Sequence, residues 1–184
     1  QAVEAYRALA EKYENAELFT EGLTDVGRPL HLFVISEDKD FDPVSLHKKG
    51  KVVVLINNGI HPGEPCGIDA SIKFVRRVLS EKAYRPLLGK VVLAVIPVYN
   101  IGGTLNRNEY WRPQQPGPEE SGFRGNARNL DLNRDFAKQD TRNARSFAEI
   151  FHKWNPDIFL DTHTTNGSDH KHVITLISTN KDRF

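Results

Sequence analysis

The sequence predicts a single α/β domain over residues 1–184, in which a mostly parallel, mixed sheet carries helices on both faces. Two observations lead to this fold class. Three short apolar runs, at 52–56, 91–98 and 158–162, lack a polar alternation, which is typical of strands buried on both faces. Helical apolar spacing at 68–79 separates the first two runs, so the order is strand, helix, strand, and the crossover should be right-handed.

Composition indicates an ordinary globular protein without a polyanionic or membrane partner. Of the 184 residues, 39% are hydrophobic and 27% are charged, and 25 lysines and arginines balance 24 acidic residues. This balance favours neither nucleic acid nor a membrane surface as a partner, and no apolar run approaches the length of a membrane span. The single cysteine, Cys66, excludes an internal disulfide, and we expect it to be a small buried residue at a helix start.

The segments before the central strand predict one helix and one further strand. Residues 2–14 have the apolar spacing of an amphipathic surface helix, and residues 30–36 form an apolar run typical of a strand. Only a short polar connection separates 30–36 from 52–56. We therefore expect these two strands to pair antiparallel, which would make the sheet mixed.

The second half of the chain begins with a long irregular segment, residues 99–134, which is rich in glycine, asparagine and arginine. A segment of this length without periodicity is either disordered or functional. We expect Asp140 to cap a third helix that ends at Asn155 and Pro156. A buried strand at 158–162 and a final strand at 172–178 complete the predicted elements.

Chemistry-bearing side chains follow the predicted strands. His61 and Glu64 come after the strand at 52–56, and His163 comes directly after the strand at 158–162. Open α/β sheets bind ligands at the carboxyl ends of their strands. Catalytic Zn²⁺ sites commonly use two histidines and one glutamate. Taken alone, His-x-x-Glu is equally compatible with a polar loop whose carboxylate interacts with the dipole of the following helix.

Four motifs in order, GIHPGE, NEYWR, NLDLNRDF and LDTHTTN, extend over residues 52–166. In these motifs the chain resembles the zinc metallocarboxypeptidases of the carboxypeptidase A family. The resemblance implies a carboxypeptidase A-like fold and hydrolysis of the C-terminal peptide bond of peptides by a zinc-activated water. It implies Zn²⁺ as the cofactor and, as the partner, a peptide or peptide-like substrate with a free C-terminal carboxylate.

The resemblance also implies a role for each matching residue. His61, Glu64 and His163 would be the zinc ligands, and Arg112 would polarise the scissile carbonyl and stabilise its oxyanion. Asp131 would accept a hydrogen bond from a ligand histidine, and Asn133 and Arg134 would bind the terminal carboxylate of the substrate. A planar guanidinium suits bidentate carboxylate binding, and ligand histidines usually donate to a carboxylate or carbonyl. The histidines that match nothing in the family pattern are expected to be surface or structural: His31, His47, His152, His170 and His172.

The chain also departs from the family pattern. Gly63 stands where some members have an arginine, and Thr165 stands where a tyrosine is common. Asp135 stands where an asparagine is common after Asn-Arg, which would place a negative charge beside the residues expected to bind the substrate carboxylate. In the family, a general-base glutamate and a capping tyrosine follow the third ligand at a distance, but no residue after His163 is of either type. We therefore expect the C-terminal part of the catalytic domain to be absent from this chain, and the gene to continue for about 100 residues.

Two alternatives remain open at this point. One is a zinc-dependent amino-acid deacylase of related fold, which would use similar ligands. The other is a non-catalytic zinc- or peptide-binding module that lacks the general base. The resemblance, together with the lack of an initiator methionine at Gln1, also suggests a secreted or periplasmic location.

Overall fold

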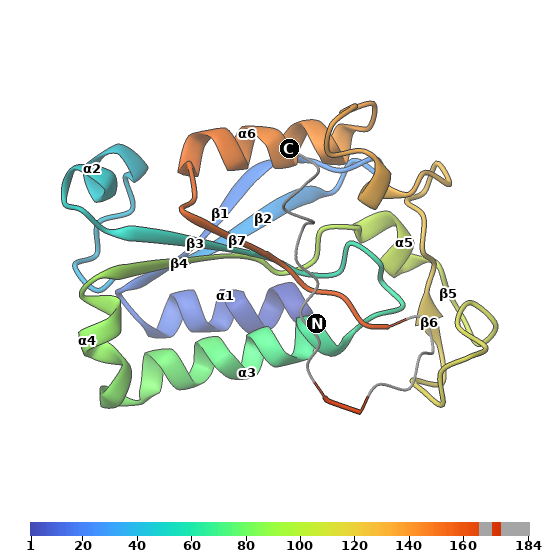
Figure 1. Ribbon diagram of the computed structural model, residues 1–184, viewed down its shortest axis with the longest axis horizontal. Coiled ribbons are helices and arrows are strands. Elements are labelled where there is room, and N and C mark those ends of the chain that lie inside the picture. Colours follow the sequence, from blue (N-terminus) through green and yellow to red (C-terminus); the bar gives the residue numbers. More distant parts are fainter. Residues whose placement is uncertain (166–170, 174–184) are drawn as a thin grey trace.

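The computed structural model describes residues 1–165 and 171–173, which form three layers with the sheet in the middle (Figure 1). Helices α1 (Ala2–Lys12) and α3 (Cys66–Ser80) cover one face of the sheet. Helices α2 (Pro43–Lys48) and α6 (Arg142–Trp154) lie on the other. The mixed α/β fold with helices on both faces is therefore confirmed.

The sheet has the strand order β1-β2-β4-β3-β7. Strands β3 (Val52–Asn57), β4 (Val91–Ile96) and β7 (Ile158–Asp161) are parallel, with β3 in the centre of the three. Strand β2 (Pro29–Ile35) pairs antiparallel with β4, and β1 (Ala16–Leu23) pairs antiparallel with β2. The carboxyl ends of β3, β4 and β7 consequently lie at one edge of the sheet.

The predicted pairing of the second strand was wrong in its partner. Strand β2 pairs with β4, not with β3, although the pairing is antiparallel and the sheet is mixed as expected. The connection between β2 and β3 contains α2, which Asp42 caps by accepting a hydrogen bond from the Val44 amide. Helix α2 takes the chain across the end of the sheet, so β3 joins the sheet beyond the position next to β2, which β4 occupies.

The alternation of side chains along the strands supplies a core to each face. On β4, Val92, Ala94 and Ile96 face α6, whereas Leu93 and Val95 face α1 and α3. Because both faces are covered, the strands need consecutive apolar residues, which is the pattern that made them visible in the sequence.

Several elements differ from the predictions. Helix α6 begins at Arg142 with Thr141 as its N-cap, because the Thr141 hydroxyl accepts a hydrogen bond from the Ala144 amide at 3.0 Å. Cys66, the first residue of α3, is exposed and not buried as expected. Strand β1 was not predicted, because its half-exposed edge position permits polar residues. The strand predicted at 172–178 lies almost entirely outside the described residues.

Short elements that the sequence did not predict are a 3₁₀ turn at Lys82–Tyr84, α4 (Arg85–Leu88), α5 (Ile101–Leu105), β5 (Arg107–Asn108), β6 (Ser121–Gly122) and a 3₁₀ turn at Leu132–Arg134.

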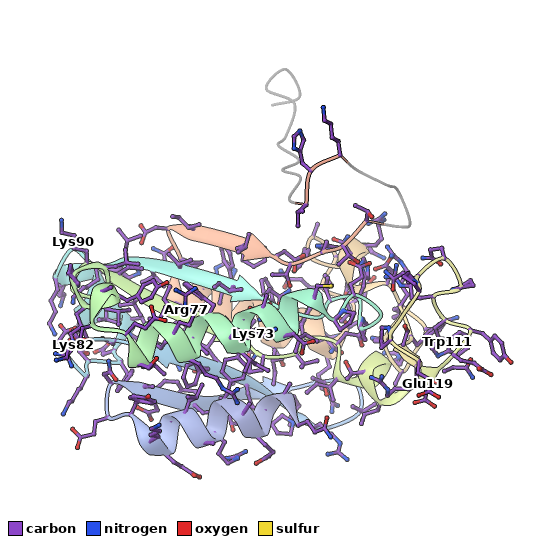
Figure 2. The ribbon with its side chains drawn as sticks, turned by 90° about the horizontal axis from the view of Figure 1, so that it is seen from below. Lys73, Arg77, Lys82, Lys90, Trp111 and Glu119 are labelled. Atoms are coloured by element: carbon purple, nitrogen blue, oxygen red, sulfur yellow. The ribbon has the colours of Figure 1, made fainter. Side chains whose placement is uncertain are left out.

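The long irregular segment is a structured loop system at the carboxyl edge of the parallel strands. It contains α5 and the small hairpin of β5 and β6. Figure 2 places Trp111 and Glu119, which belong to this segment, at the end of the molecule opposite Lys82 and Lys90. Among the described residues, no helix is long and apolar enough to cross a membrane.

Candidate metal centre

A buried asparagine joins the strand ends that carry the site. The Asn58 carbonyl oxygen Oδ1 accepts hydrogen bonds from the hydroxyls of Ser71 on α3 and Thr162 after β7, at 2.9 and 3.0 Å. Its amide Nδ2 donates to the Ile96 carbonyl of β4 at 3.1 Å. A buried polar group that satisfies several segments at once fixes their relative positions. The loops that follow β3 and β7 therefore start from one rigid point.

The loop after β3 turns sharply and presents His61 and Glu64 inward. Gly59 has φ +68°, a conformation that L side chains rarely adopt. The Glu64 amide donates to the His61 carbonyl at 2.9 Å, closing the turn. Both side chains are only 2% exposed. Two side chains of opposite potential charge are thus buried next to each other.

The structure brings His61, Glu64 and His163 together. One potential ligand atom from each residue lies within 4.8 Å of the others. The rings of His61 and His163 meet nearly edge to face, with centroids 5.0 Å apart. His163 is the exposed member of the three, so the group opens to solvent on the β7 side.

The donor atoms fit a divalent metal. The His61 Nδ1 atom is buried and has no hydrogen-bond partner among the described residues, although Glu64 Oε1 lies 3.2 Å away. Leaving such a nitrogen unpaired costs free energy unless another group binds it. Two imidazoles and a carboxylate are a donor set that Zn²⁺ accepts. The site is therefore a suitable place for one zinc ion.

The electrostatics of Glu64 keep it ionised. Burial by itself would raise the pKa of this carboxyl. Three neighbours outweigh burial and hold the pKa at about 2, namely the His61 ring, the Thr164 amide and the Arg112 guanidinium. The Thr164 amide donates to Glu64 Oε2 at 2.8 Å, and Arg112 Nη2 contacts Oε1. A charged carboxylate is the form that a cation requires.

Asp131 lies behind His61, on the side away from Glu64. Its Oδ1 atom is 3.1 Å from His61 Nε2 and accepts a hydrogen bond from the Asn133 amide at 3.0 Å. A proton on Nε2 would therefore leave Nδ1 free to bind a metal. Burial would raise the pKa of Asp131, but the hydrogen bonds from His61 and the Asn133 amide lower it below its ordinary value.

The structure places the side chain of Asn133 beside His163. The side-chain nitrogen Nδ2 of Asn133 lies 3.3 Å from His163 Nε2. Arg134 is exposed, and its Nη1 donates to the Asn133 carbonyl at 3.0 Å. Of the predicted substrate-binding pair, Asn133 thus lies next to the exposed donor His163, and Arg134 is its exposed neighbour in the chain.

Arg112 is buried over the His61 loop. Its contact with Glu64 places its guanidinium directly at the donor group. The neighbouring Trp111 packs on Phe123, with ring centroids 5.0 Å apart, so the loop that carries Arg112 is fixed from outside.

The negative charge of Asp135 does not face the predicted carboxylate-binding residues, contrary to the expectation from sequence, because it is used elsewhere. It is buried, and its two oxygens accept hydrogen bonds from the Asp140 amide and from the amide and hydroxyl of Thr141, at 2.9, 3.0 and 2.6 Å. Burial would raise the pKa of Asp135, but the hydrogen bonds from Thr141 lower it. Its charge is used to fix the start of α6.

Two residues near the donors were not singled out in the sequence. Arg124 pairs with Asp131. The Asp161 carboxylate lies 3.6 Å from His163 Nδ1 and accepts a hydrogen bond from the side-chain Nδ2 of Asn57 at 3.0 Å. Burial raises the pKa of Asp161 to about 6. Asp161 could have been noticed as a carboxylate two residues before His163, whereas Arg124 is one of three arginines in RGNARNLDLNR.

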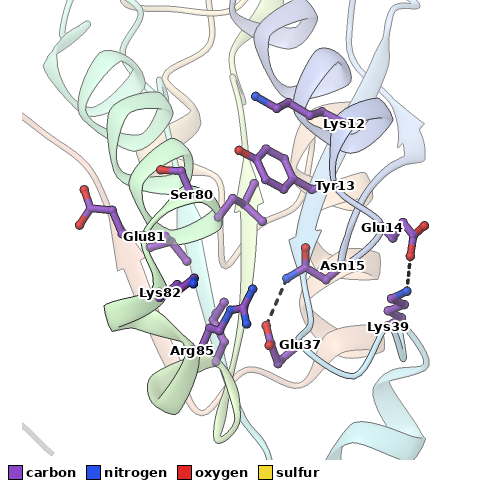
Figure 3. A pocket seen from close by; sticks show the side chains of 13 residues that line it. Lys12, Tyr13, Glu14, Asn15, Glu37, Lys39, Ser80, Glu81, Lys82 and Arg85 are labelled. Carbon is purple, nitrogen blue, oxygen red and sulfur yellow. Dashed lines mark hydrogen bonds and ion pairs between the residues drawn. The ribbon is translucent and has the colours of Figure 1, made fainter.

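A separate cavity of about 440 Å³ lies far from these donors (Figure 3). Lys12, Lys82 and Arg85 are among its lining residues, at the ends of α1 and α3 where the parallel strands begin. It shares no residue with the site described above.

Comparison with known proteins gives the family of the chain. The family described as zinc carboxypeptidase matches residues 3–170. "Probable carboxypeptidase 2" of Arthroderma benhamiae is 24% identical over 134 residues, which are 72% of this chain and 22% of that protein.

Solved structures share the fold. A metallo-carboxypeptidase from Pseudomonas aeruginosa, in complex with (2-guanidinoethylmercapto)succinic acid, superposes with a TM-score of 0.69 at 20% identity, over 91% of this chain and 40% of that one. A metallo-carboxypeptidase from Burkholderia cenocepacia gives a TM-score of 0.68 at 20% identity, over 89% and 40% of the two chains. The chain spans less than half of the length of these relatives. Since the family match covers most of its residues, the chain belongs to the zinc carboxypeptidase family.

Proposed function

We propose that the protein is a zinc-dependent metallocarboxypeptidase that hydrolyses the C-terminal peptide bond of peptides. The observation that carries this proposal is the buried Nδ1 of His61, which accepts no hydrogen bond among the described residues and lies within a group of three donors. His61, Glu64 and His163 would hold the ion. The chemistry that zinc supplies in such sites is polarisation of a carbonyl and activation of water.

The residues around the donors would orient the substrate. Arg134 is exposed and is bonded to Asn133, whose side chain lies beside His163, so the planar guanidinium could bind a terminal carboxylate through two hydrogen bonds. Arg112 lies at the donor group and would place positive charge where an oxyanion develops. Asp131 would keep the proton of His61 on Nε2.

Metal content tests the ligand assignment. Protein purified without chelator should contain about one zinc per chain. His61→Ala should lose it, whereas His152→Ala, which removes an exposed histidine on α6, should retain it. Equal zinc in both variants would remove the basis of the assignment.

Substrate polarity tests the reaction. In the full-length protein, Arg134→Ala should reduce turnover of free-acid peptides much more than that of their C-terminal amides, because only the acids offer a carboxylate. Arg76→Ala, an exposed arginine on α3, is the matched control. If the wild-type protein cleaves acids and amides equally well, the carboxypeptidase proposal fails.

The two alternatives give different results in the same assays. Hydrolysis of N-acyl amino acids without cleavage of peptides would favour the amino-acid deacylase. Zinc binding without turnover of either substrate class would favour the non-catalytic module. The secreted or periplasmic location is a further part of the proposal and is supported by the family resemblance.

A further inference from the structure

The carboxylate of Asp131 is held on both of its oxygens. Oδ1 faces His61 Nε2 at 3.1 Å and accepts from the Asn133 amide at 3.0 Å. Oδ2 faces Arg124, whose Nε and Nη2 atoms both lie 3.1 Å from it. The two sides of the carboxylate are thus divided between the donor histidine and one arginine, so the arginine limits how the carboxylate can rotate.

The backbone that carries Arg124 is fixed to the segment that carries His61. One side-chain amide, Asn100 Nδ2, donates to the carbonyls of both Ile60 and Arg124, at 3.2 Å each. The amide of Phe123, the residue before Arg124, donates to the Gly103 carbonyl at 2.9 Å. The path from Ile60 through His61, Asp131, Arg124 and Asn100 therefore returns to Ile60 as a closed ring of contacts.

A tight loop between Arg124 and Asp131 brings the two side chains together. The buried Asn126 side chain accepts hydrogen bonds from the amides of Arg128 and Leu130, both at 3.0 Å. Its backbone amide donates to the Leu130 carbonyl at 2.9 Å. Because this loop is closed on itself, the Arg124–Asp131 pair needs little further ordering, and less rotamer entropy is lost when it forms.

We propose that Arg124 is a positioning residue for the metal centre: it orients Asp131, and through Asp131 it keeps the His61 proton on Nε2 and the Nδ1 atom directed at the ion. The inference rests on the proposed zinc function. Groups behind a ligand histidine typically change metal affinity by about 10- to 100-fold. Arg124 acts one contact further out, so its removal should weaken zinc binding by about tenfold.

The direction in which zinc affinity changes when Arg124 is removed distinguishes a positioning role from a purely electrostatic one. A cation near Zn²⁺ repels it, so removal of a guanidinium should tighten zinc binding if charge alone matters. If Arg124 orients Asp131, its removal should instead weaken zinc binding. Arg128, an exposed arginine in the same loop, is the matched control, since Arg128→Gln removes an equal charge without touching Asp131.

The experiment measures zinc affinity in the full-length protein by competition with a chromophoric chelator. Arg124→Gln should bind zinc about tenfold more weakly than the wild type, Arg128→Gln should bind it as tightly or more tightly, and Arg124→Lys should recover part of the loss. A second readout is the ¹⁵N spectrum of the metal-free His61 ring. The wild type should show the Nε2–H tautomer, and Arg124→Gln should show a mixture of both tautomers.

Each outcome is decisive for this inference. Zinc affinity that is unchanged or higher in Arg124→Gln would overturn it, and so would an unchanged His61 tautomer. A loss of kcat with unchanged zinc affinity would assign Arg124 to the substrate instead, which also overturns it. Failure of the proposed function looks different, because in that case the wild-type protein itself binds no zinc at His61.

Discussion

Gly63 and Arg112 are matched to each other: a Cβ atom at position 63 would lie only 2.7 Å from the Arg112 Nε atom and 2.8 Å from its Cγ atom. The carbonyl of Gly122 is 3.1 Å from the same point. The lack of a side chain at Gly63 is therefore a requirement for the buried position of Arg112. This explains in physical terms why an arginine, as found there in some members of the family, has no room in this chain.

Gly63→Ala should displace Arg112 without removing a donor to the metal. A misplacement of about 1 Å in a positioned group can lower the rate by about 100-fold. We expect kcat/KM to fall by about this factor while zinc content stays near one per chain. Gly89→Ala is the control, because a Cβ there makes only ordinary contacts, the nearest at 3.4 Å. Full activity in Gly63→Ala would mean that Arg112 does not act from its observed position.

Asp135→Asn should lower stability without changing substrate preference. Three donors converge on the Asp135 carboxylate, and an asparagine would turn one NH₂ group toward them. An unsatisfied or opposed buried group costs about 1–3 kcal/mol, so the free energy of unfolding should fall by about 2 kcal/mol. Chemical denaturation measures this. Asp140→Asn, which changes an exposed neighbour, should stay within about 0.5 kcal/mol of the wild type.

The difference in stability between the wild type and Asp135→Asn should depend on pH in a defined direction. The folded pKa of Asp135 is lowered relative to its ordinary value of about 3.9, so the unfolded chain binds its proton more readily. Its contribution to stability is therefore fully present above about pH 4 and is lost as the pH falls through the folded pKa. The difference between the wild type and Asp135→Asn should shrink below about pH 4. A difference that grows in acid would contradict the assignment.

Gly67→Ala should destabilise the protein, although alanine normally favours a helix. In a helix interior, alanine is better than glycine by about 1 kcal/mol. A Cβ at Gly67 would lie 2.1 Å from the Thr162 hydroxyl oxygen, which bonds to Asn58. We expect a loss of about 2 kcal/mol in the free energy of unfolding, because overpacked sites typically cost 1–3 kcal/mol. Ala70→Gly, at an exposed position of the same helix, tests whether the ordinary preference for alanine holds there.

The sequence was informative where burial imposes a pattern. Strands β3 and β4 are covered on both faces, so every position except Asn57 is apolar. In helix α6, Phe147 and Ile150 mark the face that packs on the core. The donors His61, Glu64 and His163 could be anticipated because they follow strand ends. The structure brings them together as the family resemblance implied, and their roles remain predictions.

Long-range features could not be read in the same way. The pairing of β2 depends on where α2 redirects the chain, and nothing in the residues of β2 selects β4 over β3. The burial of Asp135 depends on Thr141, a partner six residues away across a turn. Arg124 was not singled out because its significance arises only when the closed loop at Asn126 places it against Asp131.

Strand β7 exposes apolar side chains on both of its faces. Ile158 and Leu160, which point to one face, are 54% and 51% exposed, and Phe159 on the other face is 39% exposed. Among the described strands, β7 lies at the edge of the sheet and pairs only with β3. Exposed apolar edge strands are templates for association with other chains.

A polypeptide that consists of residues 1–184 alone should therefore self-associate at micromolar concentration. Ile158→Lys should reduce this association, because a charge on an edge strand opposes pairing with a second copy. Val44→Lys is the matched control: Val44 is 60% exposed, but it stands on α2 and not on a sheet edge, so the same charge there should have little effect. Sedimentation velocity at several concentrations measures the difference. A monomer at all concentrations, or equal effects of both lysines, would show that the open edge of β7 does not drive association.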